Sequence, residues 1–336
     1  MGYGLSPAAR ARCGLTMPSE PSPLLIGVDI GGTKTAVLAS VDPPFVLERI
    51  EFPTRPARGP EPAIDLIKKG IRELLSEQLS KGAELAAIGV SCGGPLDPVR
   101  GVIQAPPNLS TWIDVPITAI LRTEFGAKCH LENDANAGAV AEHRFGAGHG
   151  CRNMVFITMG TGFGAGIIAD GRLYRGTNDM AGEIGHVRLT RSGPVGYHKA
   201  GSVEGWASGG GMAQVAERAV AAARRRRERT VLKGKAVTAR DVGLAAKRGD
   251  AVALRIVRST GCRLGEALAI LVDVLNPERI VIGGLAMRLG DMLLDPARLV
   301  MRREALGVSA ETCRVVPAAL DERIGDVAAL CVAMGV

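Results

Sequence analysis

Two short glycine-rich segments have the composition of anion-binding turns. Residues 29–34 read Asp-Ile-Gly-Gly-Thr-Lys, and residues 160–164 read Gly-Thr-Gly-Phe-Gly. Backbone N–H groups are accessible in such segments because glycine has no Cβ, and successive N–H groups bind anions such as phosphate. Neither segment has the Walker spacing GxxxxGK[ST] or the dinucleotide-binding spacing GxGxxG after a strand. Each alone is more often a plain turn, but the ordered pair favours two turns that hold the β- and γ-phosphates of a nucleotide.

Asp134, between the two glycine-rich segments in the sequence, is a candidate general base. It stands at the start of a segment, residues 133–148, that has the composition of a helix. The positive end of the helix dipole and the free N–H groups there favour an ionised carboxylate. In isolation, a helix cap is the more common role of such a residue. Beside two phosphate-binding turns, Asp134 supplies the base that phosphoryl transfer needs to accept the proton of a hydroxyl.

Further polar side chains have the types that bind sugars. Glu183 and His186 occur in Gly-Glu-Ile-Gly-His, and Glu204 follows in Gly-Ser-Val-Glu-Gly. Carboxylate, imidazole and amide groups pair with hydroxyl groups as donors and acceptors. Asn108, in a proline-bounded loop, can serve in the same way. The alternatives are a charged surface turn at residues 182–186 and a turn-shaping role for Asn108.

The elements that must position these residues occur twice in the same order. Residues 24–30 and 34–40 predict two strands joined through the first glycine turn, and residues 86–92 predict a buried strand that ends in glycines. Residues 153–170 and 279–286 repeat that order. The pattern predicts an α/β protein of two duplicated domains that face each other. Helices are expected at 63–79, 133–148, 212–229, 252–277 and 324–334.

The composition is that of a globular protein, with 46% hydrophobic and 22% charged residues in a chain of 336. No uncharged apolar run reaches the roughly 18–20 residues that span a bilayer, and residues 1–22 lack the apolar stretch of a signal peptide. The seven cysteines are scattered and never in CxxC spacing, which favours a reducing compartment. We expect a cytoplasmic protein without a membrane partner.

One segment carries the whole net charge of +7. Residues 217–240 contain nine Lys or Arg and two Asp or Glu, and the rest of the chain sums to zero. The run Arg224–Arg227 is most simply a solvated helix end. Contact with a polyanion, nucleic acid or polyphosphate, is the alternative. We expect no nucleic-acid partner.

Seven segments follow one another in a distinctive order: DIGGTK (29–34), GGPLDP (93–98), APPNLSTW (105–112), ENDANAGAVAEH (132–143), MGTGFGAGI (159–167), AGEIGH (181–186) and VIGG (281–284). Together they resemble the ROK family, which contains bacterial-type sugar kinases and sugar-responsive repressors of the actin/hexokinase-like superfamily. The resemblance runs from about Leu24 to the end of the chain. It implies two RNase H-like α/β domains with the active site in an interdomain cleft.

The resemblance also implies a role for each matching residue. Asp134 matches the catalytic base that deprotonates the primary hydroxyl of the sugar. The positions that match sugar contacts are Asn108, Asn133, Glu183, His186 and Glu204. The positions that match the first phosphate motif are Asp29, Gly31, Gly32, Thr33 and Lys34, with Asp29 near Mg²⁺. The second phosphate motif matches Gly160, Thr161 and Gly162, and the glycines beneath the adenosine of ATP match Gly283 and Gly284.

Two departures from the family pattern change the expectation. Many members carry CxCGxxGC after the GEIGH motif, which binds a structural zinc. Here residues 193–204 contain no cysteine, and His186 with His198 falls short of the four ligands of a tetrahedral site. We expect no zinc, and a loop held by backbone hydrogen bonds and packing. The repressors carry a winged helix-turn-helix ahead of DIGGTK, whereas 28 residues precede Asp29 here.

The expected protein is therefore an ATP- and Mg²⁺-dependent kinase of the 6-hydroxyl of a hexose. Glucose is the first expectation for the substrate, with N-acetylmannosamine, N-acetylglucosamine and fructose as alternatives. Polyphosphate is the alternative donor, and a non-catalytic sugar-sensing regulator is the alternative from another class. We expect a homodimer. Its domains would be a disordered tail (1–23), a small domain (24–131 with 321–336) and a large domain (132–320).

Overall fold

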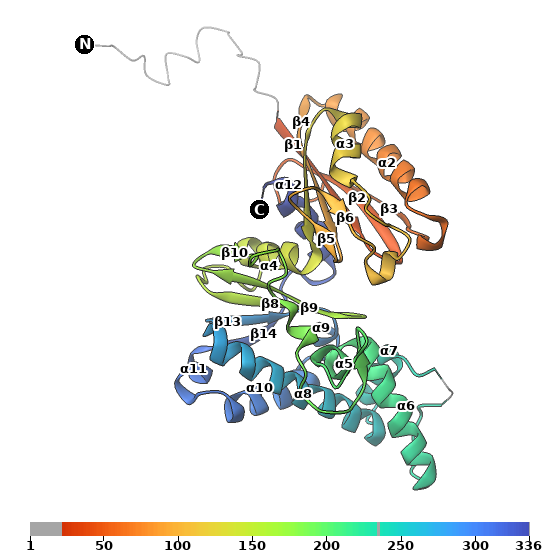
Figure 1. Ribbon diagram of the computed structural model, residues 1–336, viewed down its shortest axis with the longest axis vertical. Helices are drawn as coiled ribbons and strands as arrows, with labels where there is room; N and C mark the ends of the chain where they lie inside the picture. The colour runs from red at the N-terminus through yellow and green to blue at the C-terminus, as the bar shows by residue number, and fades with distance from the viewer. Residues whose placement is uncertain (1–21, 234–235, 336) are drawn as a thin grey trace, which may run out of the picture.

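The computed structural model describes residues 22–233 and 236–335 of the chain. The expected tail lies outside the described residues except for Ser22 and Pro23, which begin the first strand. Two five-stranded sheets form two lobes, one above the other in Figure 1, and helices cover them. The α/β class predicted from the sequence is thereby confirmed.

The first sheet has the strand order β3-β2-β1-β4-β7. Its strands are β1 (Ser22–Ile30), β2 (Lys34–Ser40), β3 (Glu48–Pro53), β4 (Ala83–Cys92) and β7 (Lys128–Asn133). β1 pairs antiparallel with β2 and parallel with β4, which in turn pairs parallel with β7. The other elements of this lobe are α2 (Glu61–Leu79), α3 (Ile117–Phe125) and the short strands β5 (Leu96–Asp97) and β6 (Val102–Ile103). α2 buries Ile67, Ile71 and Leu74 against the sheet.

The second sheet repeats this order as β10-β9-β8-β13-β14. Its strands are β8 (Met154–Met159), β9 (Phe163–Ala169), β10 (Arg172–Tyr174), β13 (Arg279–Ile282) and β14 (Arg314–Pro317). An antiparallel hairpin is again followed by two parallel strands. The duplication predicted from the two hairpins is therefore confirmed by the topology.

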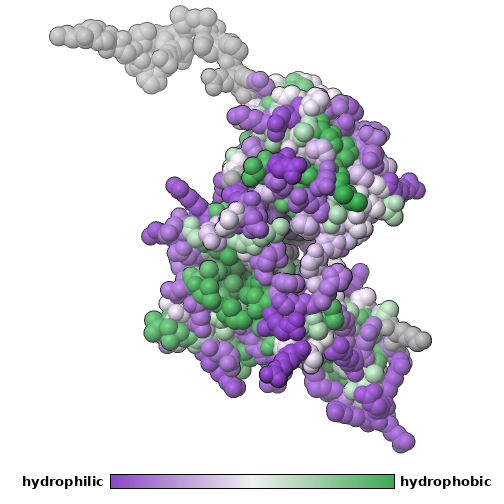
Figure 2. Space-filling view, in the orientation of Figure 1, coloured by the Kyte–Doolittle hydropathy of each residue, from purple (hydrophilic) through white to green (hydrophobic). Residues whose placement is uncertain are grey.

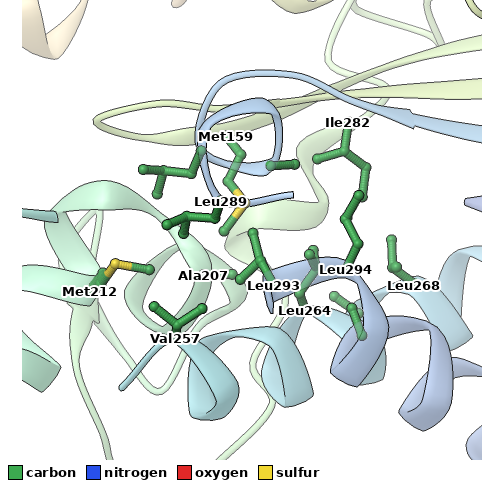
Figure 3. Close-up of a cluster of buried hydrophobic side chains, with 14 of the residues drawn as sticks. Met159, Ala207, Met212, Val257, Leu264, Leu268, Ile282, Leu289, Leu293 and Leu294 are labelled. Carbon is green, nitrogen blue, oxygen red and sulfur yellow. The ribbon is translucent and has the colours of Figure 1, made fainter. Parts of the chain in front are cut away.

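Helices of the large lobe fill the space beside this sheet. They are α4 (Asp134–Phe145), α5 (Val203–Ala207), α6 (Gly209–Arg225), α7 (Ala239–Lys247), α8 (Ala251–Leu275), α9 (Leu285–Leu289), α10 (Asp291–Glu304) and α11 (Gly307–Thr312). Figure 3 shows Met159 and Ile282 above side chains from α8 and α10, among them Leu264 and Leu294. This cluster fixes the ends of β8 and β13, where the second glycine turn and the Gly283–Gly284 pair begin.

The C-terminal helix α12 (Ile324–Ala333) lies between the two lobes (Figure 1). It packs on β1 and β4 of the first sheet and on α4, which itself lies on β8 and β9 of the second. Its residues Val327 to Ala333 are all buried. We propose the division into residues 24–131 with 321–336 and 132–320 as the two domains, with α12 in contact with both. β7 of the first sheet continues to Asn133, so this strand crosses the boundary between the two proposed domains.

Close packing of α12 requires glycine at position 89 of β4. A Cβ at Gly89 would overlap the backbone of Ala329 and lie 2.7 Å from Cα of Ala333. We expect Gly89→Ala to lower the free energy of unfolding by about 3 kcal/mol, because the helix must move away from the sheet. Thermal unfolding measures the change. The control Gly307→Ala adds a Cβ with no atom within 4 Å, and equal stability of the two variants would contradict the prediction.

The surface carries two features that the sequence singled out or left open. Arg224–Arg227 lie exposed at the end of α6, which projects away from the sheets (Figure 1). Figure 2 shows hydrophobic residues gathered around α11 on the lower lobe, where Leu306 and Val308 are 67% and 76% exposed. The polyanion contact and the homodimer stay predictions. Within the residues described, no helix has the length and apolar character needed to cross a membrane.

Candidate functional site

The first turn, residues 31–33, joins β1 to β2 and is held by Thr54. The Thr54 hydroxyl donates to the Gly31 carbonyl at 2.6 Å, and the Thr54 N–H donates to the Thr33 carbonyl at 3.1 Å. The Gly31 N–H donates to the Lys34 carbonyl. Within residues 22–233 and 236–335, the N–H groups of Gly32 and Thr33 have no acceptor. Two adjacent donors are thus free to bind an anion.

Asn108 lies against this first turn. A Cβ at Gly32 would be 2.6 Å from Cβ of Asn108, so only glycine allows the two segments to approach this closely. The loop that carries Asn108 is anchored by the fully buried Trp112, whose carbonyl accepts from the Ala105 N–H at 2.8 Å. The structure therefore brings together the first turn and one candidate sugar contact.

The second turn, residues 160–162, joins β8 to β9 and has the same property. The Gly160 N–H donates to the Gly162 carbonyl at 3.1 Å. In the described part of the chain, the N–H groups of Thr161 and Gly162 have no acceptor. The N-terminus of α6 supports the turn, because Gly209 and Gly210 donate to the carbonyls of Gly160 and Thr161. These two glycines escaped the sequence analysis, although the run Ser208-Gly-Gly-Gly was a signal for them.

Gly283 and Gly284 lie beside the second turn. The Gly283 N–H donates to the Ile157 carbonyl at 2.8 Å. A Cβ at Gly284, which has a φ of 65°, would lie 2.7 Å from the carbonyl carbon of Met159. Glycine is required there because the positive φ and the close approach both exclude a larger side chain. The proposed adenosine glycines and the second turn thus form one surface.

Asp134 lies where the chain passes from the first sheet to the second. Asn133 caps α4, with Oδ1 accepting from the N–H groups of Ala135 and Asn136 at 3.0 and 3.3 Å. Asp134 Oδ1 also accepts from the Ala135 N–H, at 2.8 Å. The residue is exposed to solvent, yet surrounding protein partly desolvates the carboxylate. Desolvation raises its pKa, while its hydrogen bonds to the backbone lower it.

Asp29, at the end of β1, lies against the start of α12. A Cβ at Gly325 would be 3.2 Å from Cγ of Asp29. Desolvation, together with the negative charges of Asp134 and Asp326, raises the pKa of Asp29 to about 7, against the lowering effects of Lys34 and Arg49. Asp134 and Asp326 therefore lie close enough to Asp29 to disfavour its negative charge.

A divalent cation would fit this excess of negative charge. The described residues hold no group of three or more His, Cys, Asp or Glu arranged to bind a metal ion. Mg²⁺ commonly takes one or two carboxylates and completes its coordination with water and substrate phosphates. Asp29, beside the free N–H groups of the first turn, has the chemistry for that kind of site.

Glu183 and His186 form a short 3₁₀ helix, η3 (Glu183–His186), which lies on β9. The contact is close because a Cβ at Gly182 would lie 2.9 Å from the carbonyl carbon of Ala165. Desolvation raises the pKa of Glu183, His186 lowers it, and the charges of Glu204 and Asp134 raise it. These four side chains therefore share one region of the molecule.

Glu204 connects that region to the second turn. It lies in the first turn of α5, and its Oε2 accepts from the Phe163 N–H at 3.1 Å. A Cβ at Gly162 would lie 3.0 Å from the same oxygen. One carboxylate oxygen of this candidate sugar contact is therefore occupied in fixing the second turn.

Comparison with known proteins identifies the family. The ROK family model matches residues 25–334. The chain belongs to the ROK family. It is 36% identical over 282 residues to the glucokinase of Halalkalibacterium halodurans, a match that covers 81% of this chain and 83% of that one.

Other relatives of this ROK protein differ in their described roles. The solved structure of a ROK family glucokinase from Streptomyces griseus, in complex with glucose and AMPPNP, superposes with a TM-score of 0.76 at 30% identity and covers 93% of this chain and 99% of that one. A xylose repressor from Caldicellulosiruptor bescii is 29% identical over 80% of this chain and 66% of its own length. The ROK fold of the solved structure confirms the actin/hexokinase-like architecture expected from the sequence.

A hairpin occupies the place of the cysteine motif in this ROK chain. β11 (Val195–Gly196) and β12 (Lys199–Ala200) are joined through Tyr197 and His198, which have φ values of 38° and 63°. Gln214 of α6 pairs with Val195, accepting from its N–H at 2.9 Å and donating to its carbonyl at 2.8 Å. The β11–β12 pairing and the Gln214 side chain thus hold the hairpin, and the expected absence of zinc stays a prediction.

Chelation is expected to leave this hairpin intact. We expect an excess of EDTA to leave the thermal unfolding midpoint unchanged, because the hydrogen bonds of the hairpin need no metal. Gln214→Ala should instead lower the free energy of unfolding by about 1 kcal/mol, because the Val195 N–H and carbonyl lose their partner. A midpoint that falls in EDTA and recovers with Zn²⁺ would refute the prediction.

Three residues of the site region received no role in the sequence analysis. Glu132 and Asn136 are buried at 2% exposure each, and Arg175 of the ROK chain pairs with Glu132 at 2.7 Å. The spacing of Glu132 and Asn136, four residues apart around Asn133-Asp134, was a signal for the first pair. Nothing local to Arg175 indicated its partner.

Proposed function

We propose that this chain is an ATP-dependent sugar kinase that transfers the γ-phosphate of ATP to the 6-hydroxyl of a hexose, with glucose as the first candidate substrate. One observation carries the proposal. A solvent-accessible carboxylate, Asp134, lies near Asp29, which closely precedes the first turn, and near Glu183, whose region continues through Glu204 to the second turn. This supports Asp134 as a base that acts with the two proposed phosphate-binding turns, which is the arrangement that phosphoryl transfer needs.

Asp134 acts as the general base. Its carboxylate accepts the proton of the 6-hydroxyl as the hydroxyl oxygen attacks the γ-phosphorus. The raised pKa brings the base nearer to the working pH than an ordinary Asp, which improves proton acceptance. Asn133, Glu183, His186 and Glu204 bind the other hydroxyl groups of the sugar, and Asn108 adds a contact from the first lobe.

The two turns bind the phosphates. Two free N–H groups in each turn, from Gly32 and Thr33 and from Thr161 and Gly162, donate to phosphate oxygens. These dipoles are already fixed by the strands, so they stabilise developing charge without rearrangement. Mg²⁺ held by Asp29 supplies neutralisation of phosphate charge when it is bound. Gly31 and Lys34 complete the first turn, and Gly283 and Gly284 lie beneath the adenosine.

The relatives support a kinase acting on glucose. The curated glucokinase and the glucose-bound solved structure both cover most of the chain. The xylose repressor relative favours a sugar-sensing regulator as the second candidate. Two turns with free donors and an accessible Asp134 favour the kinase, because a sensor of sugar needs neither phosphate turn.

ADP release from ATP and Mg²⁺ tests the proposal across a panel of sugars. The panel contains glucose, mannose, fructose, allose, N-acetylglucosamine and N-acetylmannosamine, and polyphosphate replaces ATP in a second series. Turnover that depends on a sugar supports the kinase and ranks the substrates. Sugar binding by calorimetry without turnover on either donor would support the regulator instead.

A further inference from the structure

Glu132 is a buried carboxylate whose two oxygens bind different elements. It lies near the end of β7 and is 2% exposed. Its Oε1 accepts from the Asn133 N–H at 2.9 Å and from Nδ2 of Asn136, in α4, at 3.0 Å. Its Oε2 accepts from Nε and Nη2 of Arg175 at 3.1 and 2.7 Å. One side chain of the first sheet thus binds both the start of α4 and the segment after β10.

Arg175 anchors the segment that leads to η3. It follows β10 directly, its carbonyl accepts from the Ala181 N–H at 3.0 Å, and its side chain approaches Asp179 at 3.8 Å. Residues 175–181 therefore form a closed loop, and Glu183 and His186 follow immediately. The guanidinium that binds Glu132 fixes the base of this loop.

The geometry points to Glu132 and Arg175 as positioning residues that hold η3 and the start of α4 in one arrangement. We rest this inference on the proposed sugar kinase, because the arrangement sets the distance between the sugar-binding Glu183 and the base Asp134. Nε and Nη2 of one guanidinium reach a single carboxylate oxygen, which restricts direction as well as distance. A misplacement of about 1 Å at a reacting centre lowers the rate about 100-fold.

The pair is accessible from one side. It lines a cavity of about 380 Å³, together with Arg122 and His130, between the two lobes. Removal of Arg175 alone would leave the Glu132 carboxylate facing this cavity without its guanidinium. We expect Glu132 to turn toward water there and to release Asn136, so that both attached elements move.

Four variants test the inference. They are Arg175→Met, Glu132→Gln, the double variant and Arg175→Lys. We expect Arg175→Met to lower kcat/KM for the sugar by 10- to 100-fold, mainly through KM, with KM for ATP within twofold of the wild type. Arg175→Lys, which keeps the charge without the fork, should recover part of the loss. The double variant should be no worse than the poorer single variant, because both changes break one interaction.

The matched control is Arg152→Met, since Arg152 and Asp170 form an exposed pair with 77% exposure on each side. Equal kcat/KM in Arg152→Met and Arg175→Met would overturn the inference, as would parallel losses in the sugar and ATP constants. If Arg175→Met does not fold, Arg175→Lys carries the test, with an expected loss of three- to tenfold. An unchanged Arg175→Lys would then overturn the inference.

Hydrogen exchange separates this inference from the proposed function. We expect Arg175→Met to speed amide exchange in both residues 133–140 and residues 175–186, whether or not the wild type is a kinase. A wild type without sugar-dependent turnover would refute the proposed function alone. Exchange that is unchanged, or that rises in only one of the two segments, would refute the coupling.

Discussion

Replacement of Asp134 with Asn is expected to lower sugar-dependent ADP release by about 100- to 10,000-fold, which is the usual contribution of a general base. The amide cannot accept the hydroxyl proton, but its oxygen can still accept from the Ala135 N–H, so the start of α4 should keep its structure. Calorimetry should therefore show that the sugar still binds. Coupled-enzyme kinetics and calorimetry on one preparation measure both quantities.

Asp170→Asn provides the control for this variant. Asp170 lies in the turn between β9 and β10 with a φ of 50°, a conformation that Asn adopts readily. The Asp170→Asn variant should retain full turnover. The raised pKa of Asp134 adds a pH signature, because kcat/KM of the wild type should fall as the pH drops through a pKa above the ordinary Asp value. Wild-type rates in Asp134→Asn would exclude this residue as the base.

Asp29→Asn is expected to abolish Mg²⁺-dependent turnover and yet stabilise the metal-free fold at neutral pH. Burial and neighbouring carboxylates raise the pKa of Asp29 from 3.8 to about 7. Between these values the folded chain keeps a proton that the unfolded chain has released, so the wild type loses stability as the pH rises from about 4 to 7. A shift of about 3 units corresponds to about 4 kcal/mol, and solvent contact reduces it to about 2 kcal/mol.

Unfolding of both proteins in EDTA at several pH values between 4 and 8 tests this prediction. The variant should have the shallower pH dependence and the higher midpoint at pH 8, with the two curves converging near pH 4. Parallel curves would show that the Asp29 carboxyl does not carry the proton. Asp170→Asn again serves as control, since an exposed Asp contributes little to this dependence.

The hairpins could be predicted from sequence because their signals are local. β1 and β8 are largely apolar, contain Ile and Val, and are each followed by glycines that predict a turn. The two free N–H groups in each turn follow from the same residues. The repeated order then gave the duplicated sheets, since parallel third strands must lie beside the first.

Helix α10 could not be predicted in the same way because its stability depends on a partner. Pro296 lies inside it and normally ends a helix. Close packing against α8 compensates for the backbone hydrogen bond that Pro296 removes. A Cβ at Gly261 would be 2.7 Å from Cγ of Pro296, and a Cβ at Gly265 would be 2.5 Å from the Ala297 carbonyl oxygen. The two glycines allow the helices to pack closely. This contact joins segments far apart in sequence and leaves no local signal.

The candidate site likewise contains residues with local sequence signals and residues that depend on long-range contacts. Asp134, Asn133 and the glycine turns lie in short motifs, so residue type and spacing revealed them. The pairing of Glu132 with Arg175 spans 43 residues and depends on the meeting of an edge strand with a loop of the other lobe. Only the folded structure reveals such a pair, because neither neighbourhood contains its partner.

The position of α12 has a consequence for synthesis of the protein on the ribosome. The strands of the first sheet emerge before those of the second, but α12, which covers β1 and β4, is translated about 230 residues after β4. Until then the glycine face of β4 and Leu38 of β2 lack the helix that buries them. The first lobe can therefore be completed only after the second lobe has been translated. The nascent chain must keep the uncovered face of the first sheet from aggregation during that time.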